Sequence, residues 1–317
     1  MNRRTALVLG STALLGACAP STGASPAPSS PATTPTSSNG TASPTPSGTL
    51  SASASASPSA SASGSTSPSA TGSVSQPPLG SGERASGKNH NAGAEAYVYS
   101  GKDVHTWLTG GGGPGHKVAF MTFDDGPNKT LTPLFLDKLR ELGVPATFFV
   151  IAKLLPDFAE SSKRAIAEGH AICLHSYSHD FRKLYPGGVA SAQAVAADFD
   201  QAMATARQAL GSDFKTQGYR YPGGHMSWKR MKPADEVLAQ RDAWWIDWNA
   251  MSGDADRARP STAEGMVRLM ASTLTQNPQV AVVLNHDADP TGRLTLQALP
   301  GMVNWLRSKG YSFGIIA

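Results

Sequence analysis

The stretch Val118-Ala119-Phe120-Met121-Thr122-Phe123-Asp124-Asp125-Gly126-Pro127 decides how the rest of this chain is organised. Its apolar first half is typical of a buried strand, and its closing Gly-Pro ends that strand. Two adjacent carboxylates, Asp124 and Asp125, therefore lie where a strand passes into a loop. An isolated Asp-Asp-Gly often makes only turn hydrogen bonds. Burying both carboxylates requires a cation or a shared proton beside them, so the stretch predicts either a plain turn or a cation site.

Strand and helix patterns alternate after this stretch. Strands are expected over 118–121, 146–151, 171–174, 218–221, 243–247, 280–284 and 312–316, and helices over 131–142, 158–168, 189–210, 231–241, 262–275 and 294–309. This alternation predicts a parallel sheet that is closed, or nearly closed, into a barrel. In such barrels the chemistry is carried by groups at the carboxyl ends of the strands.

The first residues of the chain predict export. Residues 1–18 are typical of a signal peptide, with Arg3 and Arg4 before an apolar run that is short for a membrane span. Cys18 ends a Leu-Gly-Ala-Cys sequence that resembles the lipobox of bacterial lipoproteins. This predicts lipidation of Cys18 and anchoring on the outer face of the cytoplasmic membrane. A plain secretion signal stays open, as does the choice between the Sec and twin-arginine routes.

Residues 19–90 are expected to form a disordered linker. Between Ala19 and Gly82 there is no charged or aromatic residue, so this segment cannot bury enough apolar surface to offset the entropy of ordering. Residues 91–116 are expected to be a polar lead-in and a flexible entry, since their glycine run precedes a strand and not a helix. The globular catalytic domain is expected over residues 117–317.

Charge and cysteine content exclude some classes of protein. The formal net charge of +4 includes Arg3 and Arg4 and falls to +2 without them. This charge is too small and too dispersed to predict nucleic-acid binding. Cys173 is the only cysteine after Cys18, so no disulfide can form within the mature domain. Cys173 lies in an apolar run and is expected in the core. The protein is expected to be a monomer.

Two histidines follow the expected strand 171–174. His175 and His179 are four residues apart and share a face if the loop turns helical, which suits a single metal. With one carboxylate from another strand end they form a set typical of catalytic zinc sites. Non-haem iron oxygenases use the same set. The second adjacent Asp favours a hydrolase, because an oxygenase has no need of that base.

Three further strand ends carry polar groups. An arginine there can orient a carboxylate, and a Gly-Gly backbone can donate to an oxyanion. Taken singly, each group also fits a turn, a surface arginine, a core tryptophan or a structural histidine. Five strand ends with reactive groups together favour one catalytic site. The segments are Arg220 to Gly224, Asp247 to Asp254 with Trp248, and Leu284 to His286.

These segments resemble, in order, the five motifs of the polysaccharide deacetylase family, also called the NodB homology domain or carbohydrate esterase family 4. The motifs are Thr122–Pro127, His175–His179, Arg220–Gly224, Asp247–Asp254 and Leu284–His286. The resemblance covers residues 117–317 and implies a distorted (β/α)7–8 barrel. The third and fourth motifs are most similar to the peptidoglycan N-acetylglucosamine deacetylase branch. The resemblance therefore implies hydrolysis of N-acetyl groups on a glycan.

The resemblance also implies the role of each residue. A divalent metal, zinc first and cobalt, nickel or manganese as alternatives, would be held by Asp125, His175 and His179. The general base would be Asp124 and its orienting group Arg220; the oxyanion would be held by the metal and the N–H of Gly223. The general acid would be His286, with its pKa raised by Asp247 or else by Asp254. Leu284 would line the acetyl pocket and Trp248 the substrate site.

Two departures from the family pattern are visible. Cys173 and Leu174 precede His175 where small or amide residues are usual. Gly223 replaces the tyrosine of many members, so that a wall of the site is lost unless His225 or Trp228 fills it.

The predicted lipid anchor and linker favour peptidoglycan as the substrate, because they would hold the domain beside the cell wall. Chitin oligomers and O-acetylated xylan stay open as substrates. A non-catalytic, sugar-binding surface lipoprotein is the rival from another class, but such a protein is expected to have lost the base or a ligand. This chain keeps Asp124, Asp125, His175, His179 and His286.

Overall fold

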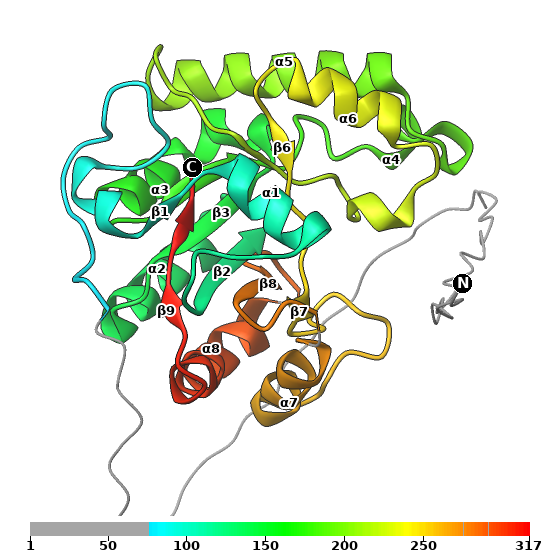
Figure 1. Ribbon diagram of the computed structural model, residues 1–317. Coiled ribbons are helices and arrows are strands. Elements are labelled where there is room, and N and C mark those ends of the chain that lie inside the picture. Colours follow the sequence, from blue (N-terminus) through cyan, green and yellow to red (C-terminus); the bar gives the residue numbers. More distant parts are fainter. Residues whose placement is uncertain (1–75, 275, 291) are drawn as a thin grey trace, which may run out of the picture. The chain divides into compact units, whose positions relative to one another are not determined.

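The computed structural model describes residues 76–317 except 275 and 291 (Figure 1). The predicted signal peptide, Cys18 and the linker up to residue 75 lie outside the described residues. Within the described part of the chain, no helix is both long enough and apolar enough to cross a membrane.

A curled, all-parallel sheet forms the centre of the domain. Its strands are hydrogen-bonded in the order β6-β5-β4-β3-β2-β8-β7, and β9 pairs with the start of β2. The strands are β2 (Val118–Asp124), β3 (Ala146–Val150), β4 (Ala171–Leu174), β5 (Gly218–Tyr219), β6 (Trp244–Trp245), β7 (Ala250–Met251), β8 (Val280–His286) and β9 (Ser312–Phe313). The predicted distorted barrel is confirmed as a half-barrel, with β6 and β7 at its two edges.

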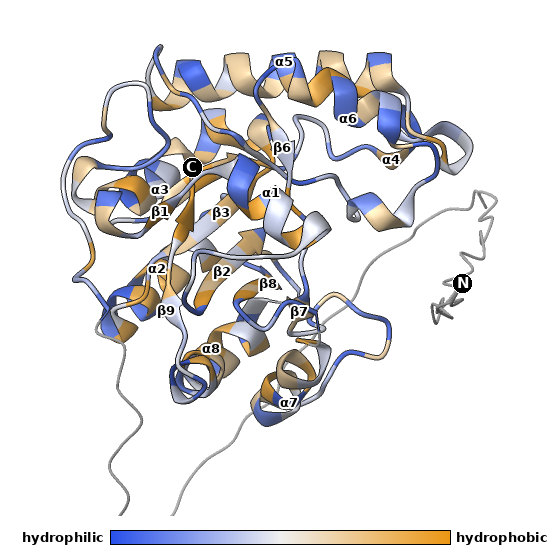
Figure 2. Cartoon of the chain, viewed as in Figure 1, coloured by the Kyte–Doolittle hydropathy of each residue, from blue (hydrophilic) through white to orange (hydrophobic). Residues whose placement is uncertain are grey.

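Helices connect the strands and cover the outer face of the sheet. They are α2 (Leu131–Leu142), α3 (Leu155–Ala167), α5 (Ala192–Leu210), α6 (Lys232–Ala239), α7 (Ala263–Thr273) and α8 (Gly292–Ser308), with short turns at η2 (Ala152–Leu154), α4 (Phe181–Leu184), η3 (Pro186–Gly188) and η4 (His225–Ser227). Figure 2 shows apolar residues along β2 and β3 and mixed polar and apolar residues along the surrounding helices. This pattern is expected where one face of each helix packs on a sheet.

Alternate residues of each strand face two separate cores. Met121 and Phe123 lie in the outer core, which the helices cover. Phe120, Val282 and Cys173 lie in the inner core, enclosed by the curled sheet. The prediction that Cys173 is a core residue is confirmed, since its side chain is fully buried.

The structure differs from the sequence prediction in the segment before the barrel. Residues 76–90, expected as linker, pack on the domain: Gln76 exchanges two hydrogen bonds with the backbone of Phe313, and buried Asn89 donates to the carbonyls of Ile172 and Ile316 at 3.0 Å. The lead-in folds into η1 (Ala92–Tyr97), β1 (Val98–Tyr99) and α1 (Gly101–Gly110), and β1 pairs with β10 (Ile315–Ile316).

Helix α1 explains why the lead-in is ordered. Val104 of α1 is fully buried in the inner core, and Trp107 packs against that core. The helix lies beside β5 and β6. A half-barrel leaves its inner apolar face open to water, and α1 covers part of that face.

Candidate active site

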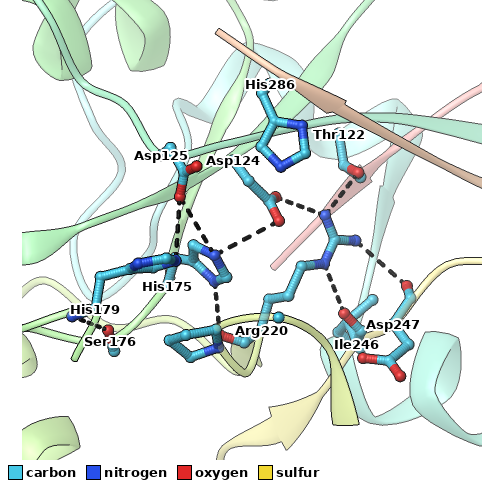
Figure 3. A network of polar contacts seen from close by, with 12 residues as sticks. Thr122, Asp124, Asp125, His175, Ser176, His179, Arg220, Ile246, Asp247 and His286 are labelled. Atoms are coloured by element: carbon cyan, nitrogen blue, oxygen red, sulfur yellow. Dashed lines mark hydrogen bonds and ion pairs between the residues drawn. The ribbon is translucent and has the colours of Figure 1, made fainter. Parts of the chain in front are cut away.

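The carboxyl ends of four strands bring most of the predicted polar side chains together (Figure 3). Asp124 ends β2, and its register partner on β8 is His286. His175 directly follows β4, and Arg220 directly follows β5. All four continue the inner-face alternation of their strands, so their side chains point into one space at the mouth of the half-barrel.

Asp125, His175 and His179 have the geometry of a metal-binding group. One ligand atom from each lies within 4.8 Å of the others. Asp125 Oδ1 is 3.6 Å from His175 Nε2 and 3.3 Å from His179 Nε2. Ligands placed about 2.1 Å from a tetrahedral ion are roughly 3.4 Å apart. The spacing therefore fits one divalent ion, and Figure 3 shows the Asp125 carboxylate facing both rings.

The protonation pattern of these side chains also fits a cation. His175 Nδ1 lies 2.8 Å from the carbonyl oxygen of Arg220 and so donates to it, which leaves the Nε2 lone pair facing Asp125. Burial lowers the pKa of His175 to about 3, so its ring is neutral, the form that binds metals. Asp125 Oδ1 is buried without a hydrogen-bond partner among the described residues. An orphaned carboxylate oxygen between two imidazole nitrogens fits a bound cation.

Asp124 is held by Arg220. Its Oδ1 accepts from Arg220 Nη1 at 2.7 Å, and its Oδ2 lies 3.7 Å from His175 Nε2. Burial raises the pKa of Asp124, and the charge of Arg220 opposes this. Arg220 is itself fully buried, donating to Thr122 Oγ1 at 2.9 Å and to the Ile246 carbonyl at 2.8 Å. The Arg220 guanidinium therefore fixes Oδ1 of Asp124, and Oδ2 faces the site.

The carboxylate beside His286 is Asp254, and not Asp247. Asp254 Oδ1 lies 2.8 Å from His286 Nδ1, while Asp254 Oδ2 accepts from the His286 backbone N–H and from Thr295 Oγ1 at 2.8 Å. Burial alone would lower the pKa of His286, but the hydrogen bond and charge of Asp254, with the charges of Asp124 and Asp125, raise it to about 9. His286 is therefore protonated at neutral pH.

The choice between Asp247 and Asp254, which the sequence left open, follows from the strand order. Asp247 follows β6, at one edge of the sheet, whereas Asp254 follows β7, which pairs with the strand of His286. Asp247 Oδ1 instead accepts from the backbone N–H of His225 at 2.9 Å, and its carbonyl accepts from Arg220 Nη2 at 3.3 Å. Asp247 therefore supports the loop that begins at Gly223.

Replacing Asp254 by Asn is expected to move the alkaline limb of the pH–activity profile to lower pH by about one unit or more, because the carboxylate charge that favours protonated His286 is lost. Initial rates across pH measure this shift. Asp247→Asn is the matched control and is expected to leave the position of the limb in place. A limb that does not move in Asp254→Asn contradicts the assignment.

The predicted substrate-side residues differ in backbone conformation and burial. Gly223 and Gly224 have φ values of 77° and 82°, in the left-handed region that favours glycine. Trp248 is half-buried against the inner core, and a Cβ on Gly224 would come 2.7 Å from its ring. Leu284, on β8, is 9% exposed. The loop Gly223–Gly224 therefore rests on Trp248.

Trp228, and not His225, lies beside Gly223. A Cβ on Gly223 would come 3.2 Å from the Trp228 ring. His225 instead stacks on Trp245 with ring centroids 3.8 Å apart and contacts Asp235 at 3.0 Å. Of the two candidates for the missing aromatic wall, the structure places Trp228 there.

Asp198 is a site residue that the sequence reasoning missed. It is fully buried on α5, and its two oxygens accept from the backbone N–H groups of Tyr177 at 2.6 Å and Ser178 at 3.2 Å. It therefore holds the loop between His175 and His179. An acidic residue between Val195 and Phe199, on the apolar face of a helix, was the available signal.

Replacing Asp198 by Ala is expected to weaken metal binding by about tenfold or more, because the loop that carries two ligands loses both of its anchors. Titration of the metal against a competing chelator measures this. Asp200→Ala on the same helix removes an exposed partner of Arg241 and is the matched control. Equal metal affinity in the two variants would contradict this role.

Asp287 was also missed. Its side chain is buried, its Oδ2 accepts from Thr132 Oγ1 at 2.5 Å, and burial raises its pKa to about 7. Its carboxylate lies against the loop that carries Asp125, since a Cβ on Gly126 would come 2.6 Å from it. Only glycine fits at position 126 while this carboxylate stays in place.

Comparison with known proteins agrees with this fold. A family model described as polysaccharide deacetylase matches residues 111–237. The chain is 30% identical over 203 residues to the putative polysaccharide deacetylase YheN of Bacillus subtilis, covering 64% of this chain and 68% of that protein. It is 30% identical over 207 residues to a peptidoglycan-N-acetylglucosamine deacetylase of Bacillus cereus, and this match covers 63% of this chain and 70% of that protein.

Among solved structures, a Streptococcus mutans carbohydrate esterase of family 4 superposes with a TM-score of 0.70 at 36% identity, covering 74% of this chain and 98% of that one. The fold and the site thus define a hydrolase of N-acetyl groups on polysaccharides. The chain belongs to the polysaccharide deacetylase family, carbohydrate esterase family 4.

Proposed function

We propose that this protein is a metal-dependent deacetylase that removes N-acetyl groups from N-acetylglucosamine residues of peptidoglycan and releases acetate. The observation that carries the proposal is the convergence of Asp125, His175 and His179 within 4.8 Å, beside an Arg220-bound Asp124 and a protonated His286. The peptidoglycan deacetylase relative in Bacillus cereus supports the choice of glycan.

The metal would be held by Asp125, His175 and His179. A divalent ion, zinc first and cobalt, nickel or manganese as alternatives, supplies Lewis-acid activation of the acetamide carbonyl and of water when bound. The protein side of the site is prepared for it by the neutral His175 ring and the orphaned Asp125 Oδ1.

Asp124 is the proposed general base. Arg220 holds its Oδ1 at 2.7 Å, so that Oδ2 is the oxygen available to take the proton of the attacking water. The backbone N–H of Gly223 is proposed to donate to the oxyanion that forms on the acetyl carbon. Leu284 lines the space proposed for the acetyl methyl, and Trp248 borders the sugar.

His286 is the proposed general acid. Its Nδ1 is engaged by Asp254 at 2.8 Å, which leaves Nε2 to donate a proton to the leaving nitrogen as the C–N bond breaks. The acetyl carbon keeps the oxygen of water and leaves as acetate, while the sugar keeps a free amine. Water, base and acid thereby account for every proton.

The cellular place of the protein is part of the proposal. The Leu-Gly-Ala-Cys sequence ending at Cys18 and the Ser/Ala/Pro/Thr-rich residues after it support a lipid anchor with a long tether that lets the domain reach the wall. The mass of the N-terminal peptide of the exported protein tests for the diacylglyceryl cysteine.

The deciding experiment is acetate release by the mature chain, stripped of metal and reloaded with zinc. Purified peptidoglycan fragments, chitin oligomers and acetylated xylan are compared side by side. Zinc-dependent release from the peptidoglycan fragments is the expected result. Release from chitin or xylan alone would make that polymer, and not peptidoglycan, the substrate. No release from any of the three, with zinc bound at one per chain, would favour a sugar-binding lipoprotein.

A further inference from the structure

An exposed aromatic side chain lies directly beside the metal-binding group. Among the residues that the structure describes, the exposed large hydrophobic side chains are Leu134, Phe181 and Met226. Phe181 is 43% exposed, and its ring centroid lies 5.2 Å from that of His179. Met226 is 88% exposed on η4, in the loop that also carries Gly223 and Trp228. Two of these three side chains therefore belong to the loops that border the site.

Phe181 is the outer member of a row of packed rings. Its centroid lies 5.3 Å from that of Trp228, and Trp228 stacks on Tyr185 at 4.1 Å with an interplanar angle of 12°. Trp228 Nε1 also donates to the carbonyl of Pro222 at 2.8 Å. The Asp180 side chain caps the turn that begins at Phe181, accepting from Arg182 N at 2.9 Å. These contacts hold the Phe181 ring in position while one part of it stays in water.

Single exposed hydrophobic side chains are common on protein surfaces, but Phe181 and Met226 both lie on segments that border one catalytic site, and apolar side chains gathered in this way indicate a binding surface. The polar groups of a pyranose lie on its rim, and its C–H face is apolar, so aromatic rings suit it. A glycan strand bound with one acetamide at the metal-binding group extends beyond the site on at least one side, and His179 borders one of these sides. On the His179 side, the exposed aromatic ring next to the site is that of Phe181.

We propose that Phe181, backed by Trp228, is a stacking platform for the sugar next to the one that is deacetylated. This inference rests on the proposed function and adds to it a second sugar subsite on the His179 side. The substrate is then a glycan chain of at least two sugars, and Phe181 recognises it through the apolar face of one pyranose ring.

The test compares Phe181→Ala with Leu134→Ala in the mature chain. Leu134 is 41% exposed on α2 and serves as the matched control for loss of an exposed apolar side chain. For Phe181→Ala, kcat/KM on a six-sugar oligomer of the peptidoglycan glycan strand is expected to fall by about 2- to 10-fold, mainly through KM. The loss is expected to be smaller on the shortest oligomer that the enzyme accepts. Phe181→Trp is expected to restore the KM.

A second measurement keeps binding separate from catalysis. The six-sugar oligomer is titrated calorimetrically into metal-loaded Asp124→Asn with and without Phe181→Ala. Weaker binding in the double variant supports the platform even if no glycan releases acetate, in which case the proposed deacetylase function alone fails. If acetate is released but Phe181→Ala matches Leu134→Ala in KM, and Phe181→Ala leaves the dissociation constant of Asp124→Asn unchanged, the platform is overturned.

Discussion

Replacing Asp124 by Asn is expected to lower kcat on the N-acetylated glycan by about 10³-fold and to leave the metal content at one per chain. The amide keeps the shape of the side chain and can still meet Arg220, 2.7 Å away in the native protein. It cannot accept the proton of the attacking water. The loss should therefore appear in kcat, with a much smaller change in KM.

Steady-state kinetics together with metal analysis by mass spectrometry checks this expectation. Asp125→Asn is the informative neighbour, because the same change one residue later removes a proposed ligand and should reduce metal content. Near-normal turnover of metal-loaded Asp124→Asn would remove Asp124 as the base. Loss of metal from that variant would instead place it among the ligands.

Replacing His175 by Ala is expected to weaken metal binding by more than about 100-fold and to abolish deacetylation at micromolar metal, since even a lost outer-shell partner costs 10- to 100-fold. His175 is the most buried of the three proposed ligands, and its Nδ1 proton is already committed to the Arg220 carbonyl at 2.8 Å.

Metal titration by calorimetry checks this, with His170→Gln as control. His170 is also a fully buried histidine, and its Nδ1 accepts from the backbone of Ala146 at 3.1 Å, away from the proposed ligands. That variant controls for loss of a buried imidazole and is expected to keep its metal. Unchanged affinity in His175→Ala would contradict the proposed ligand set.

Most of the site could be predicted from sequence because it is built on strand ends. Strands 118–121 and 171–174 are recognisable by their apolar runs, and a parallel sheet brings their carboxyl ends to one edge. The sequence alone therefore predicts that Asp124, His175 and Arg220 lie near one another, and the fold places them there. Their proposed roles stay predictions until the variants are measured.

The partner of His286 could not be predicted because it depends on strand order. Asp247 and Asp254 are seven residues apart in one motif, and both follow short strands. Strand β7 has only two residues, too few for a periodic pattern, yet its pairing with β8 decides that Asp254 meets His286. The place of a two-residue edge strand such as β7 is set by its packing against its neighbour, and local sequence carries little of that information.

The sequence by itself determined the alternating α/β architecture, the long helices and the identity of the polar side chains at the strand ends, because hydrophobic period and chain breakers are local properties. The tertiary structure decided what depends on contacts between distant segments. The half-barrel needs α1 from the lead-in to cover its inner face, and the loop of His175 and His179 needs Asp198 from α5 to hold its N–H groups. Such contacts join segments 20 to more than 100 residues apart, so they leave no periodic pattern in the sequence.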